Sequence, residues 1–129
     1  VHARKPIFGY KAIAYSSLAI SFLGLIVWAH HMFTSGTPPW LRMFFMFTTM
    51  VIAVPTGIKV FSWLATLWGG KLNLNSALLF AMGFVSMFVI GGISGVMVAA
   101  VPFDIHVHDT YFVVAHFHLV MGSASFFGL

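Results

Sequence analysis

Residues 76–101, SALLFAMGFVSMFVIGGISGVMVAAV, form the longest stretch of this chain without a charged or otherwise strongly polar side chain. A helix needs ~20 consecutive apolar residues to cross the hydrocarbon core of a lipid bilayer. Because this stretch exceeds that length, it predicts a helix that spans a membrane.

Three further apolar runs have a comparable length and extend over about 12–33, 41–68 and 110–129. The segments between the four runs are TSGTPPW, GGKLNLN and PFDIHVHD, which are short and contain Gly, Pro, Asn or Asp. Such segments are typical of connections between antiparallel helices. The sequence therefore predicts an all-α fold, a polytopic transmembrane helix bundle of about four helices that forms a single membrane domain over 1–129.

The composition supports this class. The chain is 60% hydrophobic and 6% charged, with a mean hydropathy of +1.02, which differs strongly from a soluble domain. It contains no Cys, so disulfides and thiolate metal sites are excluded, and any metal must be bound by His or by oxygen ligands. Its net charge of +4 comes from scattered side chains, which argues against a nucleic-acid partner.

The basic residues predict the orientation of the helices, because Lys and Arg favour the cytoplasmic side of short loops. Arg4, Lys5 and Lys11 precede the first apolar run, and Lys71 lies between the second and the third. These ends are expected to face the inside. Arg42 is the one basic residue that contradicts this trend.

Four histidines are expected at one depth, in the outer half of the membrane. His30 and His31 lie near the outer end of the first run, and His116 and His118 lie about two turns into the fourth. Ionisable side chains at this depth usually face a bundle interior or a cofactor. The alternative is that they are core histidines bonded to neighbouring carbonyl groups.

The spacing of these histidines indicates how they can act. Successive helical residues differ by about 100°, so His116 and His118 point to opposite faces and cannot bind one ion together. His30 and His31 are adjacent and can converge on a single ion. Imidazole suits copper, zinc, iron and nickel, so the spacing does not identify the metal.

Lys59 is the only charged residue deep within the second apolar run, in its inner half. Thr56 lies one turn closer to the histidine level on the same face, and Pro55 frees a backbone carbonyl. We expect these groups to form a proton path from the inner surface toward the metal. The alternative, in which Lys59 extends to the inner interface, needs a reach of about 13 Å, which exceeds the length of its side chain.

Two other motifs have weaker implications. The sequence GGISG at 91–95 contains a small-xxx-small pattern, which most often reflects helix packing alone. The segment PFDIHVHD contains both acidic residues of the chain, Asp104 and Asp109, together with His106 and His108. Its composition favours a solvated outer loop slightly over a cation site, because hard cations prefer oxygen ligands.

Three motifs, WAHHMF, PTGIKVFSWLATL and HDTYFVVAHFH, resemble in this order the central part of subunit I of the haem-copper oxygen reductases, specifically the cytochrome c oxidase group. The resemblance covers essentially the whole chain. It implies about four helices of the twelve-helix oxidase subunit I fold, and therefore an internal fragment of that subunit.

The resemblance assigns roles to the four histidines. His30 and His31 would be two ligands of copper B. His116 would be the axial ligand of the oxygen-binding high-spin haem, heme a3, and His118 an axial ligand of the low-spin haem, heme a. The helix that bears both residues would lie between the two haems, and electrons would pass across it.

The resemblance also assigns the polar residues. Thr56 and Lys59 would belong to the K proton channel. His108 and Asp109 would be ligands of a magnesium ion, and Asp104 would lie close to a haem propionate.

The function implied is that of a terminal respiratory oxidase. This enzyme reduces oxygen to water with four electrons from cytochrome c, delivered through subunit II, and pumps protons across a bacterial plasma membrane or an equivalent energy-transducing membrane. Subunits II and III would be further partners. The third copper ligand and the second ligand of the low-spin haem lie outside this chain, so the isolated fragment is predicted to be inactive.

Three alternatives remain. The His108–Asp109 pair favours cytochrome c as the donor, and a quinol-oxidising haem-copper oxidase is the first alternative. A non-catalytic membrane bundle that binds a metal or relays protons is another possibility, and a haem-binding electron carrier is the third.

Overall fold

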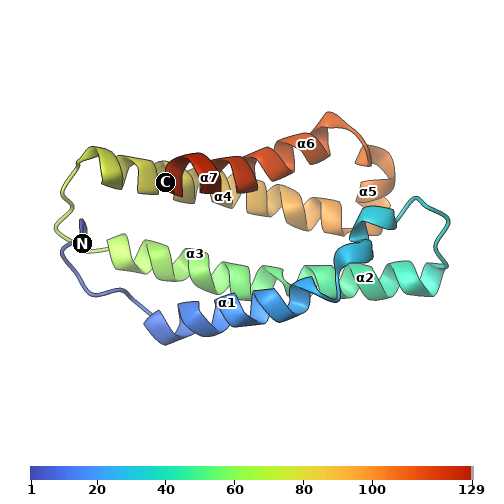
Figure 1. Ribbon diagram of the computed structural model, residues 1–129, viewed down its shortest axis with the longest axis horizontal. Coiled ribbons are helices and arrows are strands. Elements are labelled where there is room, and N and C mark those ends of the chain that lie inside the picture. The colour runs from blue at the N-terminus through green and yellow to red at the C-terminus, as the bar shows by residue number, and fades with distance from the viewer. Residues whose placement is uncertain (129) are drawn as a thin grey trace.

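The computed structural model describes residues 1–128 and contains helices without any strand in that range. The elements, in chain order, are α1 (Tyr10–Gly24), η1 (Trp28–Met32, a 3-10 helix), α2 (Pro39–Val51), α3 (Ala53–Leu67), α4 (Ser76–Ala99), α5 (Val101–Val107), α6 (Tyr111–Phe117), η2 (His118–Gly122, a π-helix) and α7 (Ser123–Gly128). In Figure 1, α1, α2 and α3 form one layer, and α4 with α6 and α7 forms the other. The predicted all-α class is confirmed.

Within residues 1–128, three helices are long and apolar enough to cross a membrane: Pro39–Leu67, Ser76–Ala99 and Tyr111–Gly128. The first of these combines α2 and α3 and has 29 residues, so at about 1.5 Å per residue it extends roughly 44 Å. The chain is therefore an integral membrane protein that crosses the bilayer more than once.

The first apolar run differs from its prediction. A single helix was expected over 12–33, but α1 ends at Gly24, and the next bonds are tighter, from Leu25 N to Phe22 O at 3.1 Å and from Ile26 N to Leu23 O at 3.0 Å. Glycine is a poor helix former, and bonds between residues three apart are those of a 3-10 turn. The expected single helix is therefore corrected to α1 and the separate 3-10 helix η1.

The segment PFDIHVHD also differs from the solvated loop that was favoured. Most of it forms the helix α5, with Pro102 in its first turn, where the missing N–H of proline costs no hydrogen bond. Asp104 in this helix is only 3% exposed. The loop prediction is wrong for this residue, because the short helix turns its carboxylate inward.

The joint between α2 and α3 is explained by Pro55, which cannot donate to the carbonyl of Val51. One turn earlier, Ile52 N donates to Thr49 O at 3.2 Å, a bond between residues three apart. The hydroxyl of Thr56 donates to the carbonyl of Ile52 at 2.8 Å. The local opening of the helix that Pro55 predicted is thus present.

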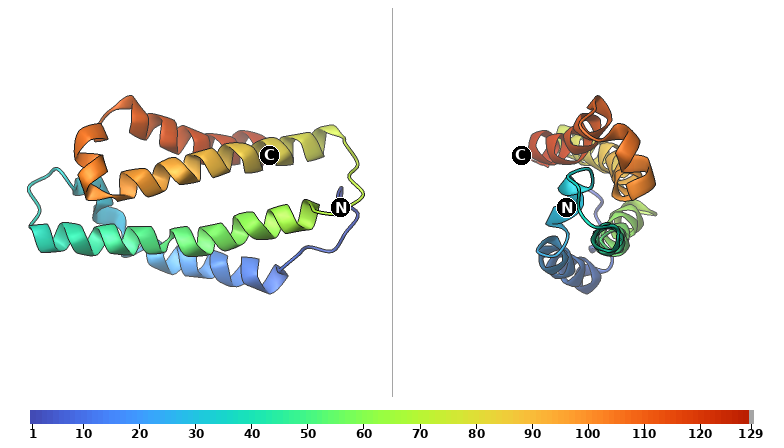
Figure 2. Two further views of the ribbon diagram at one scale, coloured as in Figure 1. Left: turned by 180° about the vertical axis from the view of Figure 1, so that it is seen from behind. Right: turned by 90° about the vertical axis from the view of Figure 1, so that its right-hand side faces the viewer.

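The N-terminal segment is held against the turn between α3 and α4 (Figure 2). Lys5 Nζ donates to the carbonyls of Ala65 at 2.9 Å and Trp68 at 2.7 Å, at the C-terminal end of α3. Asn73 N donates to His2 O at 3.0 Å. A cation at this end of a helix satisfies free carbonyl groups and complements the helix dipole.

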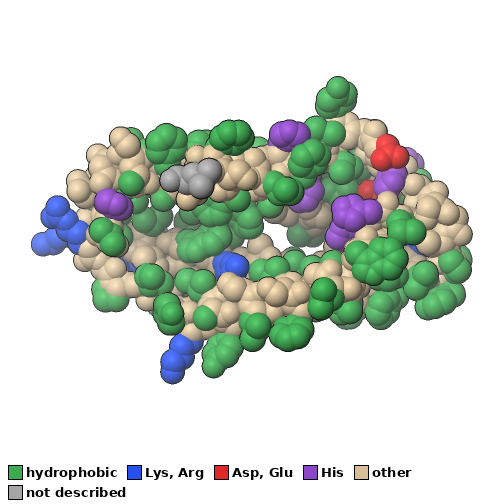
Figure 3. All heavy atoms as spheres, viewed as in Figure 1, with side chains coloured by type: hydrophobic (Ala, Val, Ile, Leu, Met, Phe, Trp, Pro, Cys, Tyr) green, Lys and Arg blue, Asp and Glu red, His purple; other side chains and the backbone are tan. Residues whose placement is uncertain are grey.

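Many large apolar side chains are exposed, and they are spread over the face that Figure 3 shows. Only a few hydrophobic residues are buried among those that the structure describes: Ala3, Val27, Ala29, Phe33, Leu78 and Ala99. A surface of this kind is stable against lipid tails or other membrane helices and unfavourable in water.

Candidate metal centre

A cavity of about 300 Å³ lies between η1, α2, α4, α5 and α6, and we call it the histidine cavity. Its lining residues are His30, His31, Thr49, Gly95, Val98, Ala99, Asp104, His108, Asp109, Val113 and His116. Three of the four histidines that were expected at one depth, His30, His31 and His116, thus meet in one place. The fourth, His118, is not part of the lining.

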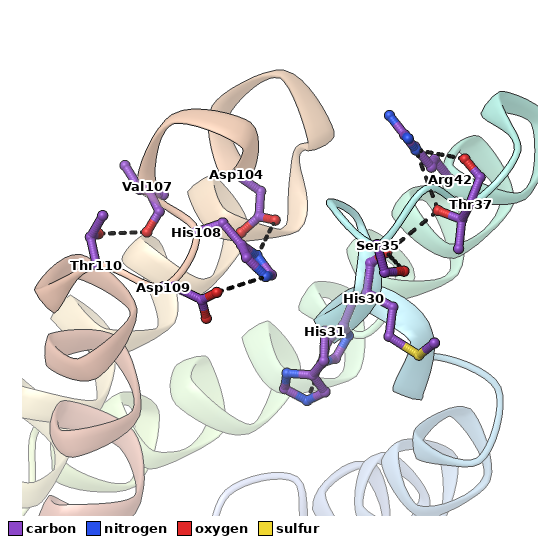
Figure 4. Close-up of polar contacts among 11 residues, drawn as sticks. His30, His31, Ser35, Thr37, Arg42, Asp104, Val107, His108, Asp109 and Thr110 are labelled. Atoms are coloured by element: carbon purple, nitrogen blue, oxygen red, sulfur yellow. Dashed lines mark hydrogen bonds and ion pairs between the residues drawn. The ribbon is translucent and has the colours of Figure 1, made fainter.

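His30 and His31 converge, as their adjacency predicted. Their Nε2 atoms lie 3.0 Å apart, and nitrogens at this separation subtend about 95° at an ion with metal–nitrogen bonds of about 2.0–2.1 Å. Both residues belong to η1, in which successive residues differ by about 120° rather than 100°. In Figure 4 the two imidazoles lie on one side of the cavity, opposite His108 and Asp109.

Thr49 fixes the tautomer of His30. Its hydroxyl donates to the carbonyl of Phe45 at 2.5 Å, so the hydroxyl oxygen must accept the second contact, from His30 Nδ1 at 3.2 Å. His30 therefore has its proton on Nδ1 and a lone pair on Nε2. This is the form in which imidazole binds a metal, with the other nitrogen oriented by a hydrogen bond.

His116 is held by α4. Its Nδ1 donates to the carbonyl of Gly91 at 2.8 Å, which leaves a lone pair on Nε2. Ser94 Oγ donates to the same carbonyl at 2.7 Å and lies 3.2 Å from His116 Nδ1. The arrangement gives His116 the same tautomer as His30 and restrains its ring.

His118 has an equivalent hydrogen bond but does not line the histidine cavity. Its Nδ1 donates to the carbonyl of Val114 in the preceding turn at 2.8 Å, and the residue is exposed. Since His116 lines the histidine cavity and His118 does not, the two imidazoles serve opposite faces. The π-helix η2 begins at His118, and such turns frequently occur at functional sites.

The acidic residues are arranged differently from their prediction. His108 Nδ1 contacts the carboxylate of the buried Asp104 at 2.9 Å, whereas its Nε2 lies 3.8 Å from the carboxylate of Asp109. The Asp109 side chain is 93% exposed. Across residues 1–128, no three His, Cys, Asp or Glu side chains are grouped as a metal site. The structure thus does not support a magnesium ion held by this stretch alone.

Thr56 and Lys59 lie one turn apart on α3, and both are half-buried. Neither lines the histidine cavity. Within the part of the chain that the structure describes, Lys59 Nζ has no hydrogen bond or ion pair. The proton path from Lys59 to the cavity therefore stays a prediction.

Thr49, Gly91, Ser94 and Gly95 contact the histidines but were not assigned to the site from the sequence. The last three belong to GGISG, which was interpreted as helix packing only. Its small residues at positions three and four apart share one helix face, and this spacing was the available signal. The spacing did not show that His116 would lie opposite this face of the helix.

The family model described as "Cytochrome C and Quinol oxidase polypeptide I" matches residues 1–129. The chain belongs to the oxidase polypeptide I family. This confirms the resemblance drawn from the three motifs, and it is consistent with the three apolar spans of the structure.

Relatives within the oxidase polypeptide I family share the whole of this chain. Proteins named cytochrome c oxidase subunit 1 from Synechocystis sp., Thermostichus vulcanus and Bacillus subtilis are 81%, 71% and 51% identical over 129 residues. The match covers 100% of this chain in each case, but only 23%, 23% and 21% of the relatives. The chain thus spans less than a quarter of the length of these relatives.

Proposed function

We propose that the chain forms part of the catalytic subunit of a terminal respiratory oxidase, which reduces oxygen to water with four electrons and couples the reaction to proton pumping. One observation carries the proposal: His30 and His116 line one cavity, each with its proton on Nδ1 and a lone pair on Nε2, while His118, in the same tautomer, does not line it. Two back-to-back imidazoles on one helix fit two separate haem irons, and family membership supports haem and copper as the groups concerned.

His30 and His31 would hold copper B. Their Nε2 atoms are 3.0 Å apart, which fits two ligands of one ion, and a third ligand would come from outside this chain. Thr49 would keep the His30 ring oriented through its hydroxyl. Copper together with a high-spin haem would supply the binding and reduction of oxygen.

His116 would hold the iron of the high-spin haem, heme a3, and His118 the iron of the low-spin haem, heme a. The hydrogen bonds from their Nδ1 atoms to the carbonyls of Gly91 and Val114 raise the basicity of Nε2 and fix the rings. Since only Phe117 separates the two ligands in sequence, the helix would provide a short route for electrons between the two haems.

Protons would enter from the inside by way of Thr56 and Lys59. Asp104, buried beside His108 in the lining of the cavity, would lie near a haem propionate. A magnesium ion at His108 and Asp109 would need further ligands from other chains or segments. Cytochrome c would deliver electrons through subunit II, with subunit III as a further partner, in the plasma membrane of a bacterium or an equivalent membrane.

Removal of each haem ligand in turn tests the proposal in the complete oxidase complex. His118→Ala should abolish the absorption of the low-spin haem and largely retain the carbon monoxide response of the high-spin haem. His116→Ala should do the reverse, because the two rings serve opposite faces. If neither variant alters either haem, the assignment is wrong.

A quinol-oxidising enzyme is the second candidate. It is a candidate because the matching family model is described for both cytochrome c and quinol oxidases, although the presence of Asp109 favours cytochrome c. Oxygen uptake by the purified complex with reduced cytochrome c, and separately with a ubiquinol analogue, distinguishes the donors. Oxygen uptake with reduced cytochrome c but none with the ubiquinol analogue would exclude the quinol enzyme.

A further inference from the structure

We propose that Gly91 and Gly95 on α4 are positioning residues that set the strength of the bond between His116 and its haem iron. The inference rests on the proposed function of His116 as a haem ligand. It gives a role to the GGISG motif at 91–95, whose pattern alone indicated only helix packing.

Gly95 lies directly against the imidazole. A Cβ added at this position would meet His116 Cε1 at 2.6 Å, with Nδ1 at 3.3 Å and Nε2 at 3.4 Å. Ordinary van der Waals contact begins at 3.4 Å, so the ring would have to move by about 0.8 Å, the difference between 3.4 and 2.6 Å. Glycine is therefore the residue that allows this ring position.

The ring is not free to make this movement. His116 Nδ1 donates to the carbonyl of Gly91 at 2.8 Å, and Ser94 Oγ lies at 3.2 Å. A displacement by 0.8 Å away from α4 would lengthen the bond to Gly91 beyond the usual range for N–H···O bonds. The methyl group of alanine and the hydrogen bond thus cannot both be accommodated.

Gly91 also lies against the residues that follow His118 in the chain. A Cβ at this position would meet Val120 Cγ2 at 2.8 Å, Leu119 Cβ at 2.9 Å and the backbone carbon of Leu119 at 3.2 Å. Leu119 and Val120 belong to η2, the π-helical turn that starts at His118. The missing side chain of Gly91 therefore lets α4 approach the backbone that follows His118.

The chemical consequence concerns the basicity of the ligand. An imidazole whose Nδ1–H donates to a carbonyl is a stronger ligand through Nε2. Weakening that hydrogen bond lowers the basicity of His116, weakens the iron–nitrogen bond and raises the reduction potential of the haem, because axial ligation tunes haem potential. Ser94 also acts on this hydrogen bond, because its hydroxyl donates to the carbonyl of Gly91 at 2.7 Å and its oxygen lies 3.2 Å from His116 Nδ1.

The test uses the complete oxidase complex with Gly95→Ala, and Gly92→Ala as the matched control. Gly92 is the neighbouring glycine of the same helix, and a Cβ there has no atom within 4 Å. Resonance Raman spectra of the reduced enzyme report the iron–histidine stretching band of the high-spin haem. Gly95→Ala should lower this frequency and raise the potential of that haem, with the low-spin haem unchanged, whereas Gly92→Ala should change neither.

Gly91→Ala should in addition shift the spectrum of the low-spin haem, because it displaces the turn after His118. Ser94→Ala adds no volume and so remains informative if the alanine variants of the glycines do not assemble. It should shift the iron–histidine frequency, since the carbonyl of Gly91 is then available to His116 alone and the Ser94 oxygen near His116 Nδ1 is removed. An unchanged frequency in Ser94→Ala, or equal effects of Gly95→Ala and Gly92→Ala, would overturn the inference.

His116→Ala separates this inference from the proposed function. If His116→Ala retains the high-spin haem, the ligand assignment fails, and with it the basis of the inference. If His116→Ala loses that haem but Gly95→Ala leaves the Raman band and the potential unaltered, the proposed function stands and only the positioning role is refuted.

Discussion

Replacing Thr49 by valine should weaken copper binding without changing a copper ligand. The Thr49 hydroxyl donates to Phe45 O and accepts from His30 Nδ1 at 3.2 Å. Valine has nearly the same shape but no hydroxyl, so the His30 N–H loses its partner and the ring is no longer held with Nε2 toward His31. Residues that orient a metal ligand typically contribute 10- to 100-fold to metal affinity.

The magnitude follows from the length of the contact. At 3.2 Å the bond lies at the long end of the normal range, so we expect the lower limit of this effect. A loss of about tenfold in copper affinity corresponds to ~1.4 kcal/mol. The change should concern copper alone, because Thr49 does not contact either of the haem ligands His116 and His118.

The assay is the copper content of the complete oxidase complex after equilibration with increasing concentrations of a copper chelator. Thr48→Val is the matched control, because the Thr48 hydroxyl contacts the carbonyls of Ile26, Phe44 and Phe45 and no imidazole. Thr49→Val should lose copper at about tenfold lower chelator concentration than the parent enzyme. Equal copper retention in both variants would refute the orienting role of Thr49.

Three further predictions concern α3 and α4. Lys59→Met should slow the reduction of the haem-copper centre while haem and copper contents stay normal, and stopped-flow reduction at the normal rate would remove Lys59 from the proton path. Lys5→Met should destabilise the C-terminal turn of α3 by about 1 kcal/mol, because the carbonyls of Ala65 and Trp68 lose a charged donor; hydrogen exchange of that turn should accelerate. Asn75→Ala removes the side-chain oxygen that accepts a hydrogen bond from Leu78 N at 2.9 Å and caps α4. The substitution should destabilise the first turn of α4 by about 1 kcal/mol, and an unchanged rate of hydrogen exchange in that turn would contradict this prediction.

Three of the four expected membrane spans, those near 41–68, 76–101 and 110–129, match helices of the described residues, because one physical requirement determines them. An apolar run of sufficient length must form a helix in a bilayer, since no water is available to its backbone groups. The same reasoning could not find the end of α1 at Gly24. Leu25, Ile26 and Val27 follow Gly24 and are apolar like much of α1, so the composition does not mark the end of the α-helix, and the change to a 3-10 helix alters only the hydrogen-bond pattern.

The candidate site was predictable to the extent that it depends on the geometry of one helix. The divergence of His116 and His118 follows from helical spacing, and the convergence of His30 and His31 from adjacency. Thr49 and the small residues of 91–95 could not be assigned, because their roles depend on which helix face opposes them. The contact of His108 with Asp104 rather than Asp109 depends on α5, which was expected to be a loop.

The central claim is that three imidazoles of this chain face an oxygen-reducing haem-copper centre while a fourth holds a separate haem. Its most direct measurement is the carbon monoxide difference spectrum of the native complex that contains this chain, together with its iron and copper content. The account predicts two haems, of which only the one bound by His116 responds to carbon monoxide, and a copper ion that is lost when His30 and His31 are replaced. A complex without haem absorption, or one whose copper is unaffected by these replacements, would contradict it and leave a metal- or proton-relaying bundle as the better description.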